Sequence, residues 1–407
     1  TDIQNQINAG TSVTIVANGT ITQNTALTFN VSSANLTPTL TLNNSSGSKQ
    51  GITLAAITDN TSATGSKVNL SAISSGGTIT VGGVINLKGD LNLDNTYQTG
   101  GNATGYINSN LAGWNTLATT SYGVYVSSAA NVTAASINFA AVTNSNVGAI
   151  TLTANVTASS GNITFNGTTT DGYGVTNANG AWASNITTAN SGSVSITGTA
   201  TGLGYGVYFG STQSVSAKSI SVNSRINSAS YGAYLNIMTL VAGGSDLTVN
   251  STVTATTSTG IYQAGNITIN SAGTNLTFTS NGIINQTGAI TLAPNSTANA
   301  ASITYNTTSG NKSSNITVGA LSVNSGSNTS AINYTVKSAG SAIAIAGAVT
   351  VPGTITLDNT YQTGGNSSGY INSALTNWDT LATTSAGITI GSGYAISGVN
   401  GIIINAV

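Results

Sequence analysis

The sequence contains no cysteine, no histidine and no glutamate, and its 407 residues include only 3 prolines. The missing side chains are those that most enzymes use as general acids or bases, as thiol nucleophiles, and as nitrogen or sulfur metal ligands. We therefore predict that the chain is not an enzyme and has no catalytic residue, cofactor or metal site. Disulfide cross-links within the chain are excluded as well.

Charge is equally scarce, since Lys and Arg number 7, all 8 acidic residues are Asp, and charged residues make up 4% of the chain. Because a chain with so few cationic side chains can neutralise only a few phosphates, we do not expect nucleic acid as a partner. No apolar run approaches the roughly 18 residues of a membrane-spanning helix. A surface with so little charge is unusual for a cytosolic protein, which depends on charge for solubility. We therefore expect an extracellular or cell-surface location.

What the chain does contain is Thr, Ser, Asn, Ala, Val and Ile, together with 49 glycines. Runs such as SVTIVANGTIT, GNITFNGTTT and SDLTVNSTVT alternate apolar and polar residues, the pattern of strands with one buried face. The runs end at Gly, Asn, Ser or Asp, which favour turns. A new strand begins roughly every 8–12 residues, a spacing typical of sandwiches, barrels and β-solenoids.

A long internal repeat distinguishes these architectures. Residues 93–121 recur at 357–385, an offset of 264, with 23 of 29 positions identical. A weaker match without gaps extends the duplication to 52–127 and 316–391. A shorter Gly-Tyr phrase, seen as SYGVYV, GYGVYF and SYGAYL, recurs between the copies. Stacked coils that bury a continuous core repeat in this way, whereas a sandwich does not.

We predict an all-β fold, a right-handed parallel β-helix (β-solenoid) with a short N-terminal capping helix. Ile3 and Ile7 lie on one face of the expected helix, which would cover the open end of the first coil. Residues 1–30 are expected to form the cap and first coil, and residues 31–407 one continuous solenoid that contains the duplicated segment. At about 24 residues per coil, this gives roughly 17 coils and a rod about 80 Å long. Thr and Ser would form ladders on its outside.

The repeated phrases GNITI, GSVSI and GYGVY, behind a capped start, resemble filamentous haemagglutinin-type exoproteins and related β-strand-repeat surface proteins. The resemblance covers most of the chain and lies in its repeated pattern of short strands and turns. It implies a secreted, non-enzymatic protein that acts in adhesion or as a surface fibre. The long secretion domain that usually comes first in that family does not occur in this sequence.

The few carboxylates give little support to catalysis. A glycoside hydrolase usually needs two carboxylates that face the sugar, yet the repeat copies of Asp90 and Asp379 are Thr354 and Asn115. Asp94 and Asp358 are the acids kept in both copies. We expect each to bond to nearby backbone N–H groups in a turn. Calcium bound by Asp94 and Asn95 is the alternative, although one carboxylate makes a poor calcium site.

Three aromatic residues recur in the duplicated segment and are the candidate contact residues: Tyr97, Tyr106 and Trp114, with copies Tyr361, Tyr370 and Trp378. Tyrosine and tryptophan suit a subunit interface or stacking on a glycan. Alternatively, the segment is a packed excursion from the coil, because Ile107, Leu111, Trp114 and Leu117 have helical spacing. We expect the Gly-Tyr phrases to form an aromatic ladder with turn glycines.

Asn-x-Ser/Thr sequons are numerous. In a secreted chain they are candidate glycosylation sites, and they include Asn18, Asn30, Asn69, Asn131, Asn162, Asn266 and Asn315. Alternatively, strands rich in Asn and Thr create the sequence by chance.

Together these observations predict a non-enzymatic extracellular structural protein, a subunit or segment of a surface fibre, sheath or adhesin. We expect its partners to be copies of itself, because the apolar C-terminal run GIIINAV invites strand addition; glycans are the other partner considered. One alternative is a carbohydrate-binding or carbohydrate-cleaving β-helix similar to phage tailspikes. The other is an S-layer lattice protein built of β-sandwich domains.

Overall fold

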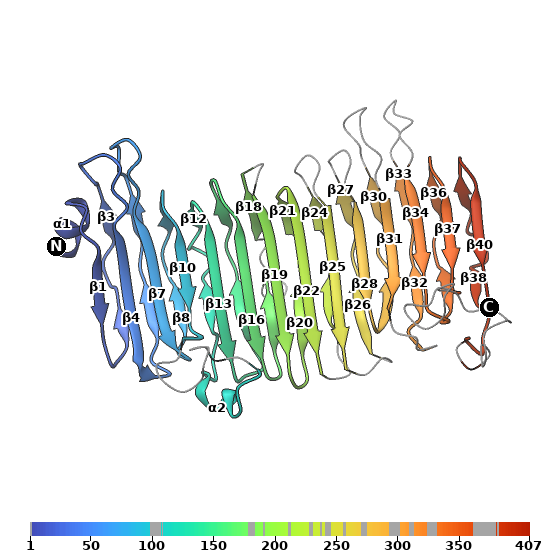
Figure 1. Cartoon of the computed structure of the whole chain (residues 1–407), viewed down its shortest axis with the longest axis horizontal. Helices are drawn as coiled ribbons and strands as arrows, with labels where there is room; N and C mark the ends of the chain where they lie inside the picture. The colour runs from blue at the N-terminus through green and yellow to red at the C-terminus, as the bar shows by residue number, and fades with distance from the viewer. Residues whose placement is uncertain are drawn as a thin grey trace, which may run out of the picture. The chain divides into compact units, whose positions relative to one another are not determined.

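The computed structural model describes most of the chain, namely residues 2–97, 107, 109–177, 184–189, 192–210, 213–227, 231–236, 238–240, 246–254, 258–269, 275–292, 302–308, 313–323, 332–360, 380 and 382–407. It divides into two compact units, unit 1 (residues 1–204) and unit 2 (residues 205–407). Each unit is a parallel β-solenoid in which successive strands along the chain belong in turn to three sheets (Figure 1).

Unit 1 begins with helix α1 (Asp2–Asn8). Its first sheet has the order β1 (Val13–Val16), β4 (Thr39–Ser48), β7 (Asn69–Ser75), β10 (Leu91–Asp94), β13 (Ile137–Thr143), β16 (Ile163–Thr169), β19 (Ser193–Ala200). The second has β2 (Ile21–Thr22), β5 (Ile52–Leu54), β8 (Ile79–Val81), β11 (Val124–Val126), β14 (Gly148–Leu152), β17 (Tyr173–Thr176). The third has β3 (Leu27–Phe29), β6 (Ile57–Asp59), β9 (Ile85–Asn86), β12 (Val132–Ala134), β15 (Val156–Ala158), β18 (Asn185–Thr188).

Unit 2 repeats the arrangement. Its first sheet has the order β22 (Ser219–Ile226), β25 (Asp246–Val253), β28 (Leu276–Ser280), β31 (Ser302–Thr307), β34 (Asn333–Lys337), β37 (Ile355–Asp358), β40 (Ile402–Asn405). The second has β20 (Tyr205–Phe209), β23 (Ala233–Leu235), β26 (Thr259–Gln263), β29 (Ile283–Gln286), β32 (Ile316–Val318), β35 (Ile343–Ile345), β38 (Ile388–Ile390). The third has β21 (Gln213–Ser216), β24 (Met238–Leu240), β27 (Ile267–Ile269), β30 (Ile290–Leu292), β33 (Leu321–Val323), β36 (Val349–Val351), β39 (Ile396–Gly398).

The period-two alternation of the sequence becomes the inside and outside of the coil. In the first sheet of unit 2, one column of aligned residues is buried inside the coil: Leu247, Leu276, Ile303, Tyr334 and Ile355. The next column points outward and is a threonine ladder: Thr248, Thr277, Thr304, Thr335 and Thr356. Burial of the apolar column removes apolar surface from water, the main force that stabilises the coil. The predicted outer ladders are confirmed.

Coil length varies with the loops. Aligned first-sheet residues are 27 positions apart for Val13 and Leu40, and 21 apart for Leu70 and Leu91. The offset rises to 46 between Leu91 and Ile137 and to 47 between Ile355 and Ile402, because the most similar part of the duplication, residues 93–121 and 357–385, falls between these aligned residues. The expected uniform coil of about 24 residues is therefore wrong, and the chain forms fewer coils than the 17 expected.

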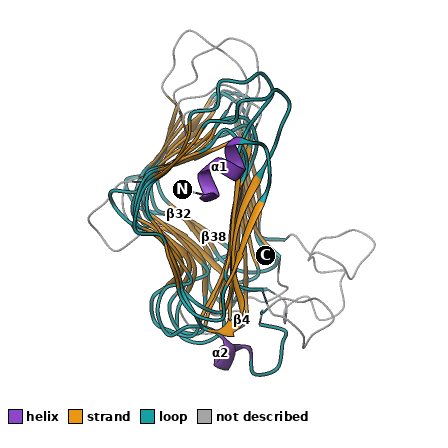
Figure 2. Ribbon diagram, turned by 90° about the vertical axis from the view of Figure 1, so that its left-hand side faces the viewer, coloured by secondary structure: helices purple, strands orange, loops and turns teal. Residues whose placement is uncertain are grey.

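The predicted capping helix is confirmed. In Figure 2, α1 lies across the end of the first coil, inside the outline of the strands. Ile7 is fully buried there, and Gln4 Nε2 donates a hydrogen bond to the Thr28 carbonyl 2.9 Å away. Gly10 follows the helix with a φ of 87°, a left-handed conformation that favours glycine at a helix end. The helix therefore covers apolar side chains that the first coil would otherwise expose.

Candidate functional site

Trp114, one of the candidate aromatic residues of the first copy, is packed rather than displayed. Trp114 begins the short helix α2 (Trp114–Leu117) and is only 8% exposed. It lies in an apolar cluster with Ile107, Ala118 and Val142, against which Leu111 and Leu117 also pack. Tyr97 is half-buried. Tyr106, Tyr361, Tyr370 and Trp378 lie outside the described residues.

Helix α2 is shorter than the sequence spacing predicted. Gly113 precedes it with a φ of 70°, so the helical conformation does not continue back toward Ile107. Ile107 and Trp114 nevertheless meet in the same cluster, because the excursion folds back on the coil. Trp114 thus anchors the excursion, and its ring is not a surface for ligand stacking.

Asp94 and Asp358 have the turn role expected of them. Asp94 Oδ1 accepts hydrogen bonds from the Thr96 backbone N–H at 2.8 Å and from its hydroxyl at 2.6 Å. Asp358 Oδ1 accepts the same pair from Thr360, at 2.9 and 2.6 Å. Burial raises the pKa of the Asp94 carboxyl, while the two hydrogen bonds from Thr96 act in the opposite direction. The repeated motif therefore builds a turn at the same point of both copies.

The asparagine that follows each of these acids was missed as a structural residue. Asn95 is fully buried; its Nδ2 donates to the carbonyls of Gly77 and Val142, and its Oδ1 accepts the Val142 N–H. Asn359 repeats this, with Nδ2 donating to a Val407 oxygen and Oδ1 accepting the Val407 N–H. Each side chain thus bonds to the backbone of the next coil. Asn95 is engaged in this way, which argues against the calcium alternative.

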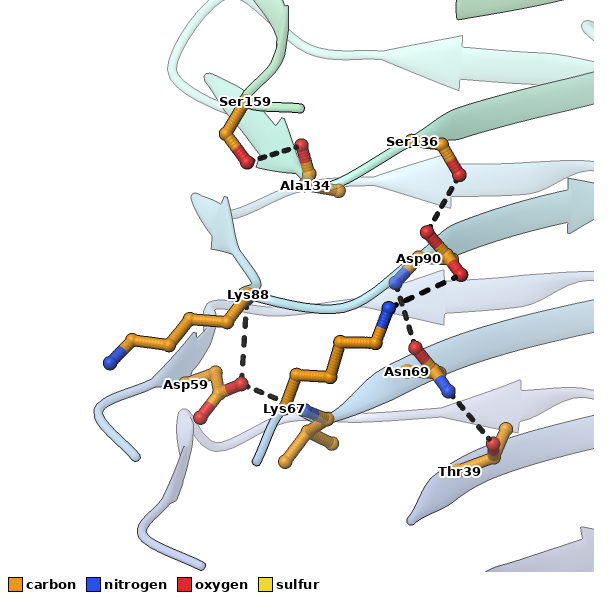
Figure 3. Close-up of polar contacts among 10 residues, drawn as sticks. Thr39, Asp59, Lys67, Asn69, Lys88, Asp90, Ala134, Ser136 and Ser159 are labelled. Atoms are coloured by element: carbon orange, nitrogen blue, oxygen red, sulfur yellow. Dashed lines mark hydrogen bonds and ion pairs between the residues drawn. The ribbon is translucent and has the colours of Figure 1, made fainter. Parts of the chain in front are cut away.

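Other acids also bind backbone at the coil corners (Figure 3). Asp59 is buried and accepts the backbone N–H groups of Thr61, Val68 and Lys88 at 3.0, 2.8 and 3.4 Å. Asp90 is exposed, accepts the Ser136 hydroxyl at 2.7 Å, and lies 4.0 Å from Lys67 Nζ. An exposed ion pair of this length contributes little to stability.

Neither a metal cluster nor a membrane-spanning helix emerges from the described ranges. Within them, no three Asp, Glu, His or Cys side chains come together in a way that could hold a metal ion. None of the helices seen in that part of the chain is long and apolar enough to cross a membrane.

Most of the named sequon asparagines share one structural role. We call them corner asparagines: each side-chain Oδ1 accepts the backbone N–H of a residue at the start of the next coil's strand. The pairs, with N–O distances, are Asn69 with Asp90 (2.8 Å), Asn131 with Asn155 (3.2 Å), Asn162 with Ser193 (2.8 Å), Asn266 with Ala289 (2.9 Å) and Asn315 with Ala342 (3.1 Å). Asn18 and Asn30 are exposed.

The corner asparagines explain why sequons are so common. In Asn162-Ile163-Thr164, the asparagine bonds across the corner, the isoleucine fills the core, and the threonine points outward. The same order of roles recurs at Asn266-Ile267-Thr268 and Asn315-Ile316-Thr317. Glycosylation modifies Nδ2, whereas the corner bond uses Oδ1, so the two are chemically compatible. Glycosylation of these residues stays a prediction.

The Gly-Tyr phrases form the expected aromatic ladder in unit 2. Tyr208, Tyr234 and Tyr262 are aligned on neighbouring strands of the second sheet, and successive ring centroids are 4.7 and 5.3 Å apart. Tyr205 and Tyr231 form a second row, 5.6 Å apart. All five side chains are half-buried. Burial, and then the neighbouring phenols of Tyr262 and Tyr231, raise the pKa of Tyr234.

The last coil exposes apolar strands. Strand β40 pairs with β37 along one edge, and its three isoleucines, Ile402, Ile403 and Ile404, are between 42% and 50% exposed. Ile402 and Ile404 align with the buried residues Ile355 and Leu357, so they belong to the core column of the coil. An apolar strand with a free edge is able to pair with another strand.

No protein-family model, curated protein or solved structure matches this chain significantly.

Proposed function

We propose that this chain is a non-enzymatic structural protein of the cell exterior, a subunit or segment of a surface fibre, sheath or adhesin. In this proposal it resembles the filamentous haemagglutinin-like surface proteins and associates with copies of itself through solenoid contacts. The observation that carries the proposal is the exposed apolar strand β40, which extends the core column of the coil. A further coil of the same register would cover it.

The position of the acids supports a structural role over a catalytic one. Asp59 and Asp358 are buried and Asp94 is half-buried, and all three accept backbone N–H groups of nearby turns. Their carboxylate oxygens accept hydrogen bonds that stabilise turns of the coil, and they are not directed at a shared substrate position. The low charge of the chain and its outer threonine ladders give a polar, uncharged wall, which suits a protein that packs beside or above its own copies.

The test compares two kinds of substitution in β40. Ile402→Lys with Ile404→Lys places two charges in the core column and should abolish polymers seen by sedimentation velocity. Ile403→Thr is the matched control, because Ile403 aligns with Thr356 in the outer ladder. We expect this control to polymerise as the parent does.

Polymers that survive the double lysine variant would contradict end-to-end association through β40. Loss of polymers in Ile403→Thr alone would instead place the contact on the outer wall. Far-UV circular dichroism of each variant checks that the strands are retained.

A further inference from the structure

The tyrosine ladder of the second sheet is interrupted in unit 1. On strand β11 and just before it, Tyr122 and Tyr125 stack with their ring centroids 4.7 Å apart. On the next strand, β14, the aligned residue opposite Tyr125 is Thr151, and by the same register Gly148 lies opposite Tyr122. On β17 the row resumes, because Tyr173 is aligned with Gly148. The coil of β14 therefore lacks one aromatic rung.

A cavity of about 140 Å³ lies beside Gly148. Tyr122 and Tyr173 form two of its walls, and Gly148, Thr151 and Thr176 also line it. A cavity of roughly 150 Å³ admits one benzene-sized ring. Tyr122 and Tyr173 belong to strands two steps apart, about 9.6 Å at the usual strand spacing. A ring midway between them would be about as far from each tyrosine ring as successive rungs are from each other in unit 2, where the ring centroids are 4.7–5.6 Å apart.

Two hydroxyl groups at this cavity are unsatisfied. Thr151 and Thr176 are aligned neighbours, only 4% and 2% exposed, and neither hydroxyl has a hydrogen-bond partner among the residues that the structure describes. Buried polar groups are nearly always hydrogen-bonded. Asn146 adds an exposed amide at the same cavity. The residues thus combine two flat apolar walls with several polar groups in need of partners.

We propose that this slot binds one pyranose ring of a saccharide. The C–H faces of the sugar would stack on Tyr122 and Tyr173, and its hydroxyls would bond to Thr151, Thr176 and Asn146. Sites that bind small ligands typically combine an aromatic lining with a small number of oriented polar groups. A phenol ring would also fit between the tyrosines, but its single hydroxyl would leave most of these polar groups unpaired. The site is independent of the strand association proposed above.

The experiment uses the full chain and a panel of methyl pyranosides of glucose, galactose and N-acetylglucosamine, with p-cresol as the phenolic probe. Binding is followed by saturation-transfer NMR and calorimetry. We expect at least one pyranoside to bind more tightly than p-cresol. Preference for p-cresol would overturn the saccharide assignment, and binding of neither probe would overturn the site.

Two variants locate the binding. Tyr122→Leu removes one wall and should weaken pyranoside binding about tenfold, which corresponds to about 1.4 kcal/mol. Thr151→Val removes one unpaired hydroxyl, so it should weaken binding while raising the midpoint of thermal unfolding. Tyr231→Leu, in the uninterrupted ladder of unit 2, is the matched control and should leave binding unchanged. Unchanged affinity in both slot variants, or an equal loss in the control, would contradict the proposal.

Discussion

The two copies of the duplicated segment have the same strands but different surroundings. Strands β5–β11 of the first copy and β32–β38 of the second correspond at the sequence offset of 264. In the first copy, Val126 on β11 pairs on one side with β8 and on the other with β14, and it is fully buried. Its counterpart Ile390 on β38 pairs with β35 and is 39% exposed.

The comparison shows that the sequence of a coil determines where its strands form. The neighbouring coil determines how deeply the residues of those strands are buried. The alternating pattern is equally apolar in both copies, yet β38, β39 and β40 remain exposed where no coil covers them. In unit 1, α1 covers the first coil. Because solenoid repeats depend on their nearest neighbours, corresponding substitutions in the two copies should differ in a predictable order.

The largest contrast is expected for an aspartate at the equivalent core positions. Val126→Asp places a carboxylate in a closed coil and should lower the free energy of unfolding by about 4 kcal/mol or more. Ile390→Asp reaches water and should lower it by less than about 1 kcal/mol. Urea unfolding followed by circular dichroism measures both. Equal losses in the two variants would show that the exposure of β38 is not a property of the folded chain.

The buried asparagines should give the next contrast. Asn95→Ala removes three hydrogen bonds and should cost about 3 kcal/mol, at about 1 kcal/mol each. Asn359→Ala removes two bonds to Val407 and should cost about 2 kcal/mol. The same denaturation assay applies. A larger loss for Asn359 than for Asn95 would contradict this ranking.

The copies also differ inside the core, where Tyr334 in the second copy replaces Leu70 of the first. The Tyr334 hydroxyl is buried without a partner in the part of the chain described, so Tyr334→Phe should stabilise by about 1 kcal/mol. Tyr305, whose ring centroid lies 6.0 Å from that of Tyr334, donates its hydroxyl to Gln286 Oε1, and Tyr305→Phe should destabilise by a similar amount. Thermal unfolding of the two variants should shift in opposite directions. A shift in the same direction would refute the assigned partners.

The smallest effect concerns the pH dependence of the first copy. Because burial raises the pKa of Asp94, the folded chain holds this proton more tightly than the unfolded chain. The contribution of Asp94 to stability therefore falls as pH rises from its ordinary value of 3.8 through its folded pKa, and is constant above that. Asp94→Asn should remove this pH dependence. Identical stability-versus-pH curves for the parent and the variant would contradict the assignment.

Much of the fold was predictable because it depends on local alternation. In SDLTVNSTV and the other alternating runs, the apolar residues mark the inside of the strand and the polar residues mark the outside. Ile7 and Gly10 indicate the capping helix and its end. The strands of the two copies lie at corresponding positions in the sequence. Coil length was not predictable from an average, because loops such as the excursion after β10 add residues without adding a strand.

The side-chain roles at the corners were harder to predict because they depend on register. Asn162 reaches Ser193, 31 positions later, and Asn95 reaches Val142, 47 positions later. Neither partner is identifiable before the coils are aligned. The signal that was available is the persistence of Leu-Asp-Asn in both copies, which pointed to the acid and equally to the asparagine. The slot at Gly148 likewise exists only because Tyr122 and Tyr173 lie two strands apart.

The most direct test of the central proposal, association through the uncovered coil, is cryo-electron microscopy of the purified chain without added ligand. We predict ordered polymers in which β38, β39 and β40 of one copy lie against a coil of the next. Separate particles of a single chain, with these strands exposed to solvent at concentrations that favour assembly, would contradict the proposal.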